Sequence, residues 1–253
     1  MRRKAKNTAA DYLGAVIFLL VLWEIASLGM NKQYFPGPYE SFLAFGREMA
    51  RGLWAHLLVS TARVVVSLAV SLVPAVVMGM VAGRVERFDR YVAPLIYLTY
   101  PVPKIIFLPL VLTLMGLGDI SKVFLISLIV FFQILVTTRD ASRQVNKNMV
   151  DSMLSLGAGD FHIYRHVIYP ACLPKILTAL RISLGTAIAV LFFSETIANR
   201  GDVGGIGYFL MEAWARMEWD VMFAAIIAMG VMGFTLYMFI EWLERKLCPW
   251  EYL

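Results

Sequence analysis

Long apolar runs separated by short polar stretches dominate the chain. Six of these runs are long enough to cross the hydrocarbon core of a bilayer as helices, which takes about 20 residues: residues 11–29, 56–83, 91–115, 121–138, 176–198 and 221–243. Six crossings place both termini on the same side of the membrane. The pattern therefore predicts an all-α membrane protein in which residues 1–253 form a single domain of six transmembrane helices.

The longest polar interruption is the connector between the fourth and fifth runs, residues 139–175. An apolar stripe at helical spacing predicts a short helix that stops at Gly157: Val150, Met153, Leu154 and Leu156. A second stripe predicts another short helix: Phe161, Tyr164, Val167 and Ile168. Pro170 and Pro174 are expected to end that helix before the next membrane run. Two amphipathic helices joined at a glycine predict a compact protrusion, and an ordinary connector lying on the membrane surface is the alternative.

Composition supports a membrane protein, and the distribution of charge orients it. The chain is 60% hydrophobic and 16% charged, with a mean hydropathy of +0.71, whereas soluble domains are about half apolar. The net charge of +5 does not indicate nucleic-acid binding, because Lys and Arg cluster beside the apolar runs. With the N-terminus inside, the inner side carries 14 of these residues and the outer side 6. We therefore expect a multi-pass membrane protein with cytoplasmic termini and a cytoplasmic connector.

The first apolar run is predicted to be a helix rather than a signal peptide, because it is long enough to span and no clean small-residue cleavage site follows it. The positive cluster before it supplies part of the inner charge: Arg2, Arg3, Lys4 and Lys6. Lys32, Lys122 and Arg200 belong to the outer set.

The third apolar run is unusual because prolines interrupt it at four positions: Pro94, Pro101, Pro103 and Pro109. Each proline removes a helix hydrogen bond that lipid cannot replace. Broken helices persist at membrane depth only where protein or a water-filled cavity satisfies the backbone. This run is therefore predicted to line a transport pathway, and a kinked helix packed against its neighbours is the alternative.

Charged residues inside the runs are candidates for function, since they are costly in a membrane. Lys104, just after the proline pair, is expected to attract anions or to act as a gate, with Glu195 as a candidate partner; a lysine that snorkels to an interface is the alternative. For Glu195, near the outer end of the fifth run, a gate, a partner for Lys104 and a simple interface residue remain open. Arg63 is expected to snorkel or to pair between helices, and Arg181 to pair with Asp151 or with carbonyl groups of the connector.

The connector resembles the cytoplasmic signature loop of binding-protein-dependent ABC importer permeases. That signature reads Glu-Ala-Ala, three residues, Gly, and about nine residues later Ile-x-Leu-Pro. In this chain Asp151-Ser152-Met153 occupies the first triplet, Gly157 stands at the expected offset, and Ile168-Tyr169-Pro170 replaces the last part. The departures fall in the triplet and in the closing segment, whereas the glycine is retained.

Other segments resemble the nitrate, sulfonate and taurine branch of the same family. They are the Pro-x-Pro turn at residues 36–38 before an expected surface helix (39–50), Pro101-Val102-Pro103 with Leu108-Pro109-Leu110, the turn at residues 116–119, the glycine-rich segment at residues 204–208, and the basic, aromatic tail at residues 242–250. Lys104 departs from this branch, which usually has an uncharged residue there. The resemblance covers most of the chain.

The resemblance implies the fold of a type I, MetI-like importer permease, a location in the bacterial cytoplasmic (inner) membrane, and a transport function without catalysis. It implies that two copies of the chain form a pathway for a small solute, such as a sulfonate, taurine or a nitrate-like anion, delivered by an extracytoplasmic substrate-binding protein. Separate ABC ATPase subunits would bind ATP and Mg²⁺, and this chain no cofactor. In this scheme the residues that couple to the ATPase are Asp151, Met153, Leu154, Leu156, Gly157, Ala158, Phe161 and Pro170. The pathway residues are Pro101, Pro103, Lys104 and Glu195, and those of an outer loop or gate are Gly204, Gly205 and Gly207.

A self-sufficient channel or secondary transporter is the main alternative, and a membrane enzyme is a weaker one. A secondary transporter normally contains its repeats or ion-site charges within one longer chain. The chain has no Gly-x-x-x-x-Gly-Lys-Ser/Thr loop, so ATP hydrolysis needs a partner. The turn at residues 116–119 matches a motif of intramembrane aspartyl proteases, but an adjacent span with a second inward aspartate is missing. The three histidines lack metal-ligand spacing, and Cys172 and Cys248 are expected to be reduced thiols.

Overall fold

The computed structural model describes residues 9–30, 34–99, 101–197 and 203–251, and within them the regular structure is helical. The main helices are α1 (Ala9–Gly29), α2 (Pro38–Glu48), α3 (Trp54–Arg84), α4 (Glu86–Thr99), α5 (Leu108–Met115), α6 (Asp119–Arg143), α7 (Lys147–Ser155), α8 (Asp160–Ile163), α9 (Tyr169–Ile197), α10 (Ile206–Ala215) and α11 (Trp219–Leu247). The expected all-α fold is confirmed. The N-terminal basic cluster, Lys32 and Arg200, which entered the orientation argument, lie outside the described residues.

Four helical runs are each long and apolar enough to cross a membrane: Pro38–Arg84, Asp119–Arg143, Asp160–Ile197 and Trp219–Leu247. A fifth is obtained if α4 and α5 together make one span, and the apolar part of α1, Leu13–Gly29, is shorter. The described helices are therefore compatible with the six expected spans. The surface helix expected at residues 39–50 is present as α2, and Gly52, with φ 124°, bends the chain where α2 passes into α3.

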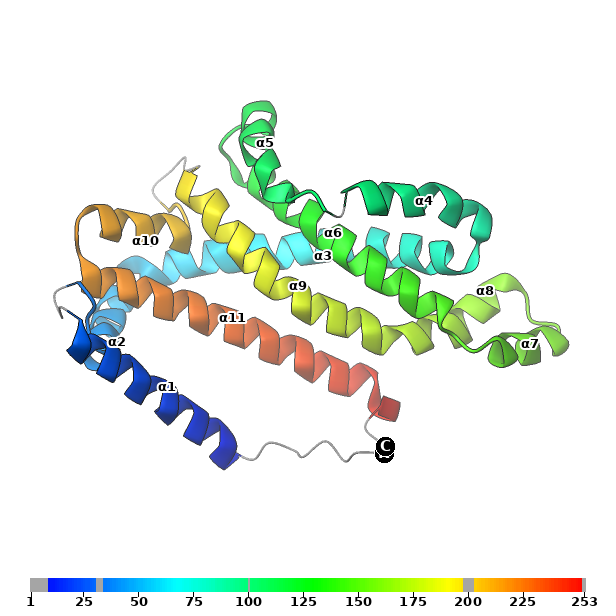
Figure 1. Ribbon diagram of the computed structural model, residues 1–253, viewed down its shortest axis with the longest axis horizontal. Helices are drawn as coiled ribbons and strands as arrows, with labels where there is room; N and C mark the ends of the chain where they lie inside the picture. The colour runs from blue at the N-terminus through cyan, green and yellow to red at the C-terminus, as the bar shows by residue number, and fades with distance from the viewer. Residues whose placement is uncertain (1–8, 31–33, 100, 198–202, 252–253) are drawn as a thin grey trace.

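The centre of the molecule is formed by α3, α6 and α9, which cross one another closely (Figure 1). Small residues recur every four positions on the buried face of α3: Ser67, Ser71, Ala75, Gly79 and Gly83. A Cβ added at Gly79 would lie 2.9 Å from the carbonyl oxygen of Leu135, and one at Gly83 would lie 2.5 Å from that of Arg139. The two backbones therefore approach closely enough that side chains are excluded, which is the small-residue packing typical of membrane helices.

The third expected span is two half-helices rather than one helix. α4 ends at Thr99, a 3-10 turn covers Lys104–Phe107, and the two helical parts meet at 84°. Pro101 and Pro103 lie in the break, and both are exposed in the single chain. The prolines therefore break this span rather than only kinking it, as the loss of their N–H groups suggested.

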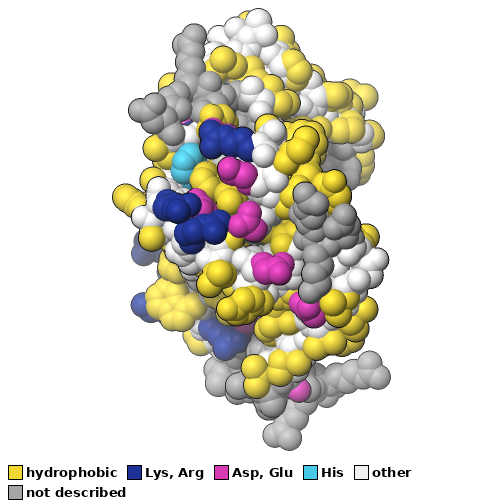
Figure 2. Space-filling view, turned by 90° about the vertical axis from the view of Figure 1, so that its left-hand side faces the viewer, with side chains coloured by type: hydrophobic (Ala, Val, Ile, Leu, Met, Phe, Trp, Pro, Cys, Tyr) yellow, Lys and Arg dark blue, Asp and Glu magenta, His cyan; other side chains and the backbone are white. Residues whose placement is uncertain are grey.

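The molecule has two distinct ends. α7 and α8 protrude at one end, and we call residues 147–163 the α7–α8 knob (Figure 1). α2, the start of α10 and the turn between α10 and α11 lie at the opposite end (Figure 1). Figure 2 views that opposite end, where basic and acidic side chains are interspersed among apolar ones. Two ion pairs from these elements are Arg47 with Asp220 and Arg216 with Glu212.

Candidate functional site

The α7–α8 knob is shaped by one cap and one glycine. The Asn146 side chain accepts a hydrogen bond from the backbone N–H of Asn148 and so caps the start of α7. The helix ends at Ser155, and Gly157 adopts φ 80°, the left-handed conformation that glycine allows without strain. The Gly157 and Ala158 N–H groups donate back to the carbonyls of Leu154 and Met153. The prediction that a helix stops at this glycine is confirmed.

The knob has an inner apolar face and an exposed apolar face. Val150 and Ile163 are buried in the core, and Met153 and Ala158 pack partly against it. The other face carries large apolar side chains with high exposed fractions: Leu154 at 52%, Met149 at 58%, Phe161 at 69% and Leu156 at 83%. The predicted single stripe is therefore wrong, because Val150 and Met153 turn inward whereas Leu154 and Leu156 turn outward. Asp151, on the same helix, is exposed.

The second helix of the connector does not end at the prolines, which corrects the sequence-based expectation. α8 continues through a π-helical segment, Tyr164–Ile168, into α9, so that Asp160–Ile197 is one helical run of 38 residues. Pro170 therefore lies in the interior of this run, directly after the wide π turn, rather than at the start of a separate helix. Pro174 is buried inside α9, where packing holds the helix despite the missing N–H. The knob is therefore joined directly to a membrane-crossing helix.

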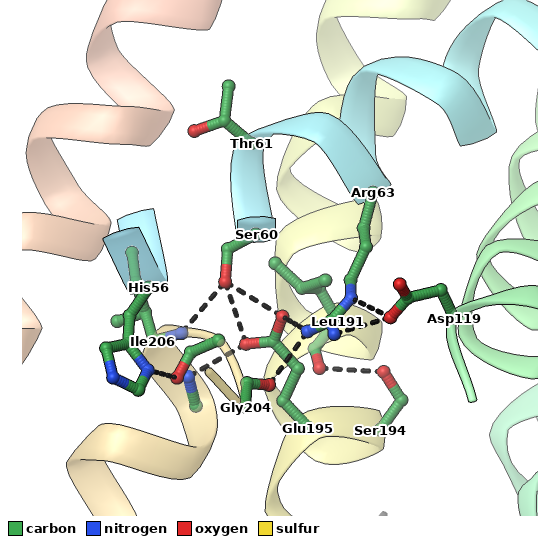
Figure 3. A network of polar contacts seen from close by, with 12 residues as sticks. His56, Ser60, Thr61, Arg63, Asp119, Leu191, Ser194, Glu195, Gly204 and Ile206 are labelled. Carbon is green, nitrogen blue, oxygen red and sulfur yellow. Dashed lines mark hydrogen bonds and ion pairs between the residues drawn. The ribbon is translucent and has the colours of Figure 1, made fainter. Parts of the chain in front are cut away.

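At the opposite end of α9, Glu195 is the centre of a buried polar network (Figure 3). Its carboxylate is fully buried and accepts hydrogen bonds from Ser60 Oγ at 2.8 and 3.0 Å and from Arg63 Nη1 at 2.6 Å. The backbone N–H of Gly207 donates to its other oxygen at 2.8 Å. Arg63 also donates from Nε and Nη2 to Asp119 Oδ1, at 2.9 and 2.5 Å. The network thus joins α3, α6, α9 and the start of α10.

This arrangement decides between the open interpretations of two charged residues. Arg63 forms ion pairs between helices, which was one of the two expectations; the other was that it snorkels to an interface. The partner of Glu195 is Arg63, so the suggested pairing with Lys104 is wrong. Removing one member of a buried ion pair typically costs about 3–5 kcal/mol because the other charge is left uncompensated. The geometry therefore gives Glu195 and Arg63 a large structural role.

The glycine segment before α10 is fitted against the same network. Arg63 Nη1 donates to the Gly204 carbonyl at 2.8 Å, and the Ile206 N–H donates to Ser60 Oγ at 2.8 Å. Gly205 adopts φ 100°, and a Cβ added there would overlap the Glu195 carboxylate and the Arg63 guanidinium. A Cβ at Gly207 would lie 2.9 Å from the Glu195 Cβ. The glycines of this segment are therefore required by close approach and by conformation.

Lys104 lies apart from that network, at the break between the two half-helices. Its Nζ donates to the Thr99 carbonyl at 3.1 Å and lies 4.9 Å from the centre of the Phe132 ring. The side chain is partly buried. A carbonyl oxygen and an aromatic face both interact favourably with an ammonium group.

Three residues of the site were missed or misplaced by sequence reasoning. Lys122 is 1% exposed and lies near enough to Arg63, Glu195 and Asp119 to interact with them electrostatically, although it had been counted as an outer charge. Asp119 had been assigned to a turn and begins α6. Ser60 had not been considered. Lys122 carried a usable signal, since it is a lysine at the second position of the expected run 121–138 and so resembles the intramembrane charges that were singled out.

Arg181 also differs from expectation. It pairs with Glu244 on α11 rather than with Asp151, and its guanidinium lies 5.3 Å from the centre of the Tyr237 ring. The pair links α9 to α11 within the bundle. Cys172 and Cys248 are both buried free thiols, in agreement with the sequence-based expectation.

A family model and individual relatives identify the same family of transport proteins. Residues 75–248 match the model of the binding-protein-dependent transport system inner membrane component. The chain is 30% identical over 242 residues to the taurine transport system permease protein TauC of Escherichia coli, covering 93% of this chain and 87% of that one. It is 30% identical over 236 residues to the putative aliphatic sulfonates transport permease protein SsuC of Bacillus subtilis, covering 92% and 84%.

A solved structure shares the fold. In an inward-facing structure of the MetNI methionine ABC transporter, the similar chain has a TM-score of 0.62 and 18% identity. The match covers 79% of this chain and 95% of that one. At this identity the likeness supports the helical arrangement alone, and that arrangement agrees with the expected MetI-like fold.

Proposed function

The chain belongs to the family of inner membrane components of binding-protein-dependent transport systems, and from this membership we propose that it imports a small organic anion of the sulfonate class. As a member of this family it is a permease subunit of an ABC importer and not an enzyme. Relatives named for taurine and for aliphatic sulfonates cover more than nine-tenths of the chain at 30% identity. This similarity is the observation that carries the proposal about the solute.

The α7–α8 knob is proposed as the docking site for the ABC ATPase subunit, which would bind the ATP and Mg²⁺. The support is its four exposed apolar side chains, Met149, Leu154, Leu156 and Phe161, at a protruding end of the molecule. Large exposed apolar side chains of this kind mark a surface that binds another protein or a membrane, and their place at a protruding end favours a protein. Asp151, Gly157 and Pro170 would shape this site, and Met153 and Ala158 would support it from below. The knob would then face the cytoplasm, together with both termini, and the opposite end would face the extracytoplasmic binding protein.

A second copy of the chain is proposed to complete the pathway. The break at Pro101 and Pro103 is exposed in the single chain, and non-helical backbone at membrane depth needs protein or a water-filled cavity beside it. Two copies that face each other at this break would provide such a cavity. Lys104 would then present its charge to an anionic solute as the solute passes.

The test is co-purification from gently solubilised membranes of the native host, with a tag at the C-terminus, followed by mass spectrometry. We expect an ATPase subunit that carries the Gly-x-x-x-x-Gly-Lys-Ser/Thr motif missing from this chain, and we expect it to be lost when Gly157 is replaced by proline. Proline cannot adopt φ 80°, so the turn of the knob would be destroyed. A homo-oligomer that never retains an ATPase would instead support the channel or secondary transporter.

A further inference from the structure

The α7–α8 knob and the Glu195 network are joined by one helix. The run Asp160–Ile197 has 38 residues and extends from the knob to the end of the molecule that lies opposite it. At 1.5 Å per residue, Glu195 lies roughly 50 Å along the helix from the knob. A displacement at one end of this helix therefore reaches the other end without passing through a loop.

At that far end, Glu195 is bonded in a way that resists separation. Its two carboxylate oxygens receive donors from α3 and from the backbone at the start of α10. The carboxylate has no exposed surface, and the Arg63 side chain is 7% exposed. A gate that opens in every cycle would have to expose or leave unpaired these charges, which is costly. The geometry fits a permanent link better than a gate.

The segment at residues 203–208 is bound to the same groups rather than to the helix end alone. Arg63 holds the Gly204 carbonyl, Ser60 holds the Ile206 N–H, and His56 Nδ1 lies 3.1 Å from the Gly205 carbonyl oxygen. A Cβ at Gly207 would lie 2.9 Å from the Glu195 Cβ on α9. The segment therefore has little freedom to move independently of α3 and α9 (Figure 3).

We propose that the Ser60–Arg63–Glu195 network is a rigid link that makes the 203–208 segment and α10 move together with α9, so that docking events at the knob are felt at the opposite end of the molecule. The inference rests on the proposed function, in which the knob meets the ATPase and the opposite end meets the binding protein. Glu195 and Arg63 act as positioning residues, and neither needs to touch the solute. Gly204, Gly205 and Gly207 were expected to form an outer loop or gate. In this proposal they are part of the segment that the network moves together with α9.

The first experiment measures hydrogen exchange, followed by mass spectrometry, of peptides covering residues 203–210 in the intact transporter complex in nanodiscs. Glu195→Gln removes the charge without changing the side-chain shape, and Glu212→Gln removes a charge from an exposed pair on α10. We expect exchange at residue 207 to become about tenfold faster in Glu195→Gln, because the Gly207 N–H loses its charged acceptor, which is worth roughly one hydrogen bond of protection. Peptides from the middle of α9 should remain unchanged, and Glu212→Gln should match the parent protein. Unchanged exchange in Glu195→Gln would overturn the proposal.

A second variant covers the case in which Glu195→Gln does not assemble. Ser60→Ala removes the acceptor of the Ile206 N–H and one donor to Glu195, while the Arg63–Glu195 pair is retained. We expect it to assemble and to show the faster exchange at residue 206. If the exchange of assembled Ser60→Ala equals that of the parent protein, the link does not hold the segment and the proposal fails.

The functional readout is the ratio of binding-protein-stimulated to basal ATPase activity in the same nanodiscs. A merely structural role would lower both activities together. The link instead requires that basal activity persists while stimulation falls by at least about fivefold in Glu195→Gln. Equal stimulation in Glu195→Gln and in the parent would refute the link. If the parent complex contains no ATPase, the proposed function fails, whereas the exchange experiment still decides whether the network holds the segment.

Discussion

Replacing Leu156 and Phe161 by serine tests the docking role of the α7–α8 knob. Both side chains project into solvent, with exposed fractions of 83% and 69%. Their removal should change the free energy of unfolding by no more than about 0.5 kcal/mol, as is usual for exposed positions. Membrane insertion and the yield of folded chain should therefore stay at the level of the unmodified protein.

The effect on docking should be much larger. Covering a Leu or Phe side chain contributes about 1.5–3 kcal/mol when the side chain is fully buried. Since part of each side chain already contacts the knob, about 3 kcal/mol is a reasonable loss for the pair. Each 1.4 kcal/mol corresponds to a tenfold change in affinity, so the dissociation constant of the ATPase should rise by roughly 100-fold.

The assay is quantitative co-purification of the ATPase subunit at a series of its concentrations. Trp250→Ser is the matched control, since Trp250 is a large apolar residue, 48% exposed, near the end of α11 and outside the knob. We expect the control to bind like the parent chain. If the Leu156→Ser/Phe161→Ser variant also retains the ATPase with an affinity within threefold of the parent's, the exposed apolar face does not form the docking site.

Three further substitutions probe the structure separately. Gly157→Ala should lower the unfolding free energy by about 1 kcal/mol because of φ 80°, whereas Gly46→Ala, inside α2 with open space for a Cβ, should not lower it. Thermal unfolding in detergent compares the two variants, and equal midpoints would contradict the assigned turn. Gly205→Ala should reduce the folded yield strongly, since its Cβ overlaps the Glu195 carboxylate, whereas Gly46→Ala has open space; size-exclusion profiles measure this, and a monodisperse Gly205→Ala chain would be inconsistent with the described packing. Lys104→Met should leave assembly intact and lower uptake of an anionic solute about tenfold, the effect of roughly one lost charge interaction; unchanged uptake would remove Lys104 from the pathway.

Local chemistry made the knob and the broken span predictable. Gly157 was identified because a helix stripe stops there, and its φ of 80° is the conformation that such a stop uses. The prolines around residue 101 predicted a disrupted span, and α4 and α5 meet at 84°. The path of the helix through Pro170 was not predictable in the same way, because the apolar spacing before it fits an ordinary helix and does not indicate the π segment, Tyr164–Ile168.

Pairing between distant charges required the three-dimensional arrangement. Arg63 and Glu195 are separated by 132 positions, and Arg181 and Glu244 lie on α9 and α11. Arg63, Glu195 and Arg181 were recognisable as intramembrane charges, whereas Glu244 falls just after the sixth run. Their partners depend on how the helices are rotated and on which of them are neighbours. Because the neighbours of each helix were not known from the sequence, Glu195 was suggested as the ion-pair partner of Lys104. The spacing of residues along the sequence predicts which face of a helix each residue occupies, but it does not predict which neighbouring helix that face contacts.

Uptake of labelled taurine and of a labelled alkanesulfonate into proteoliposomes tests the central claim most directly. The vesicles would contain this chain with its co-purified ATPase, with the binding protein added outside and ATP supplied inside. The account predicts uptake of at least one of these sulfonates that requires all three proteins and stops without ATP. Uptake by this chain alone, driven by a solute or proton gradient without any ATPase, would contradict it.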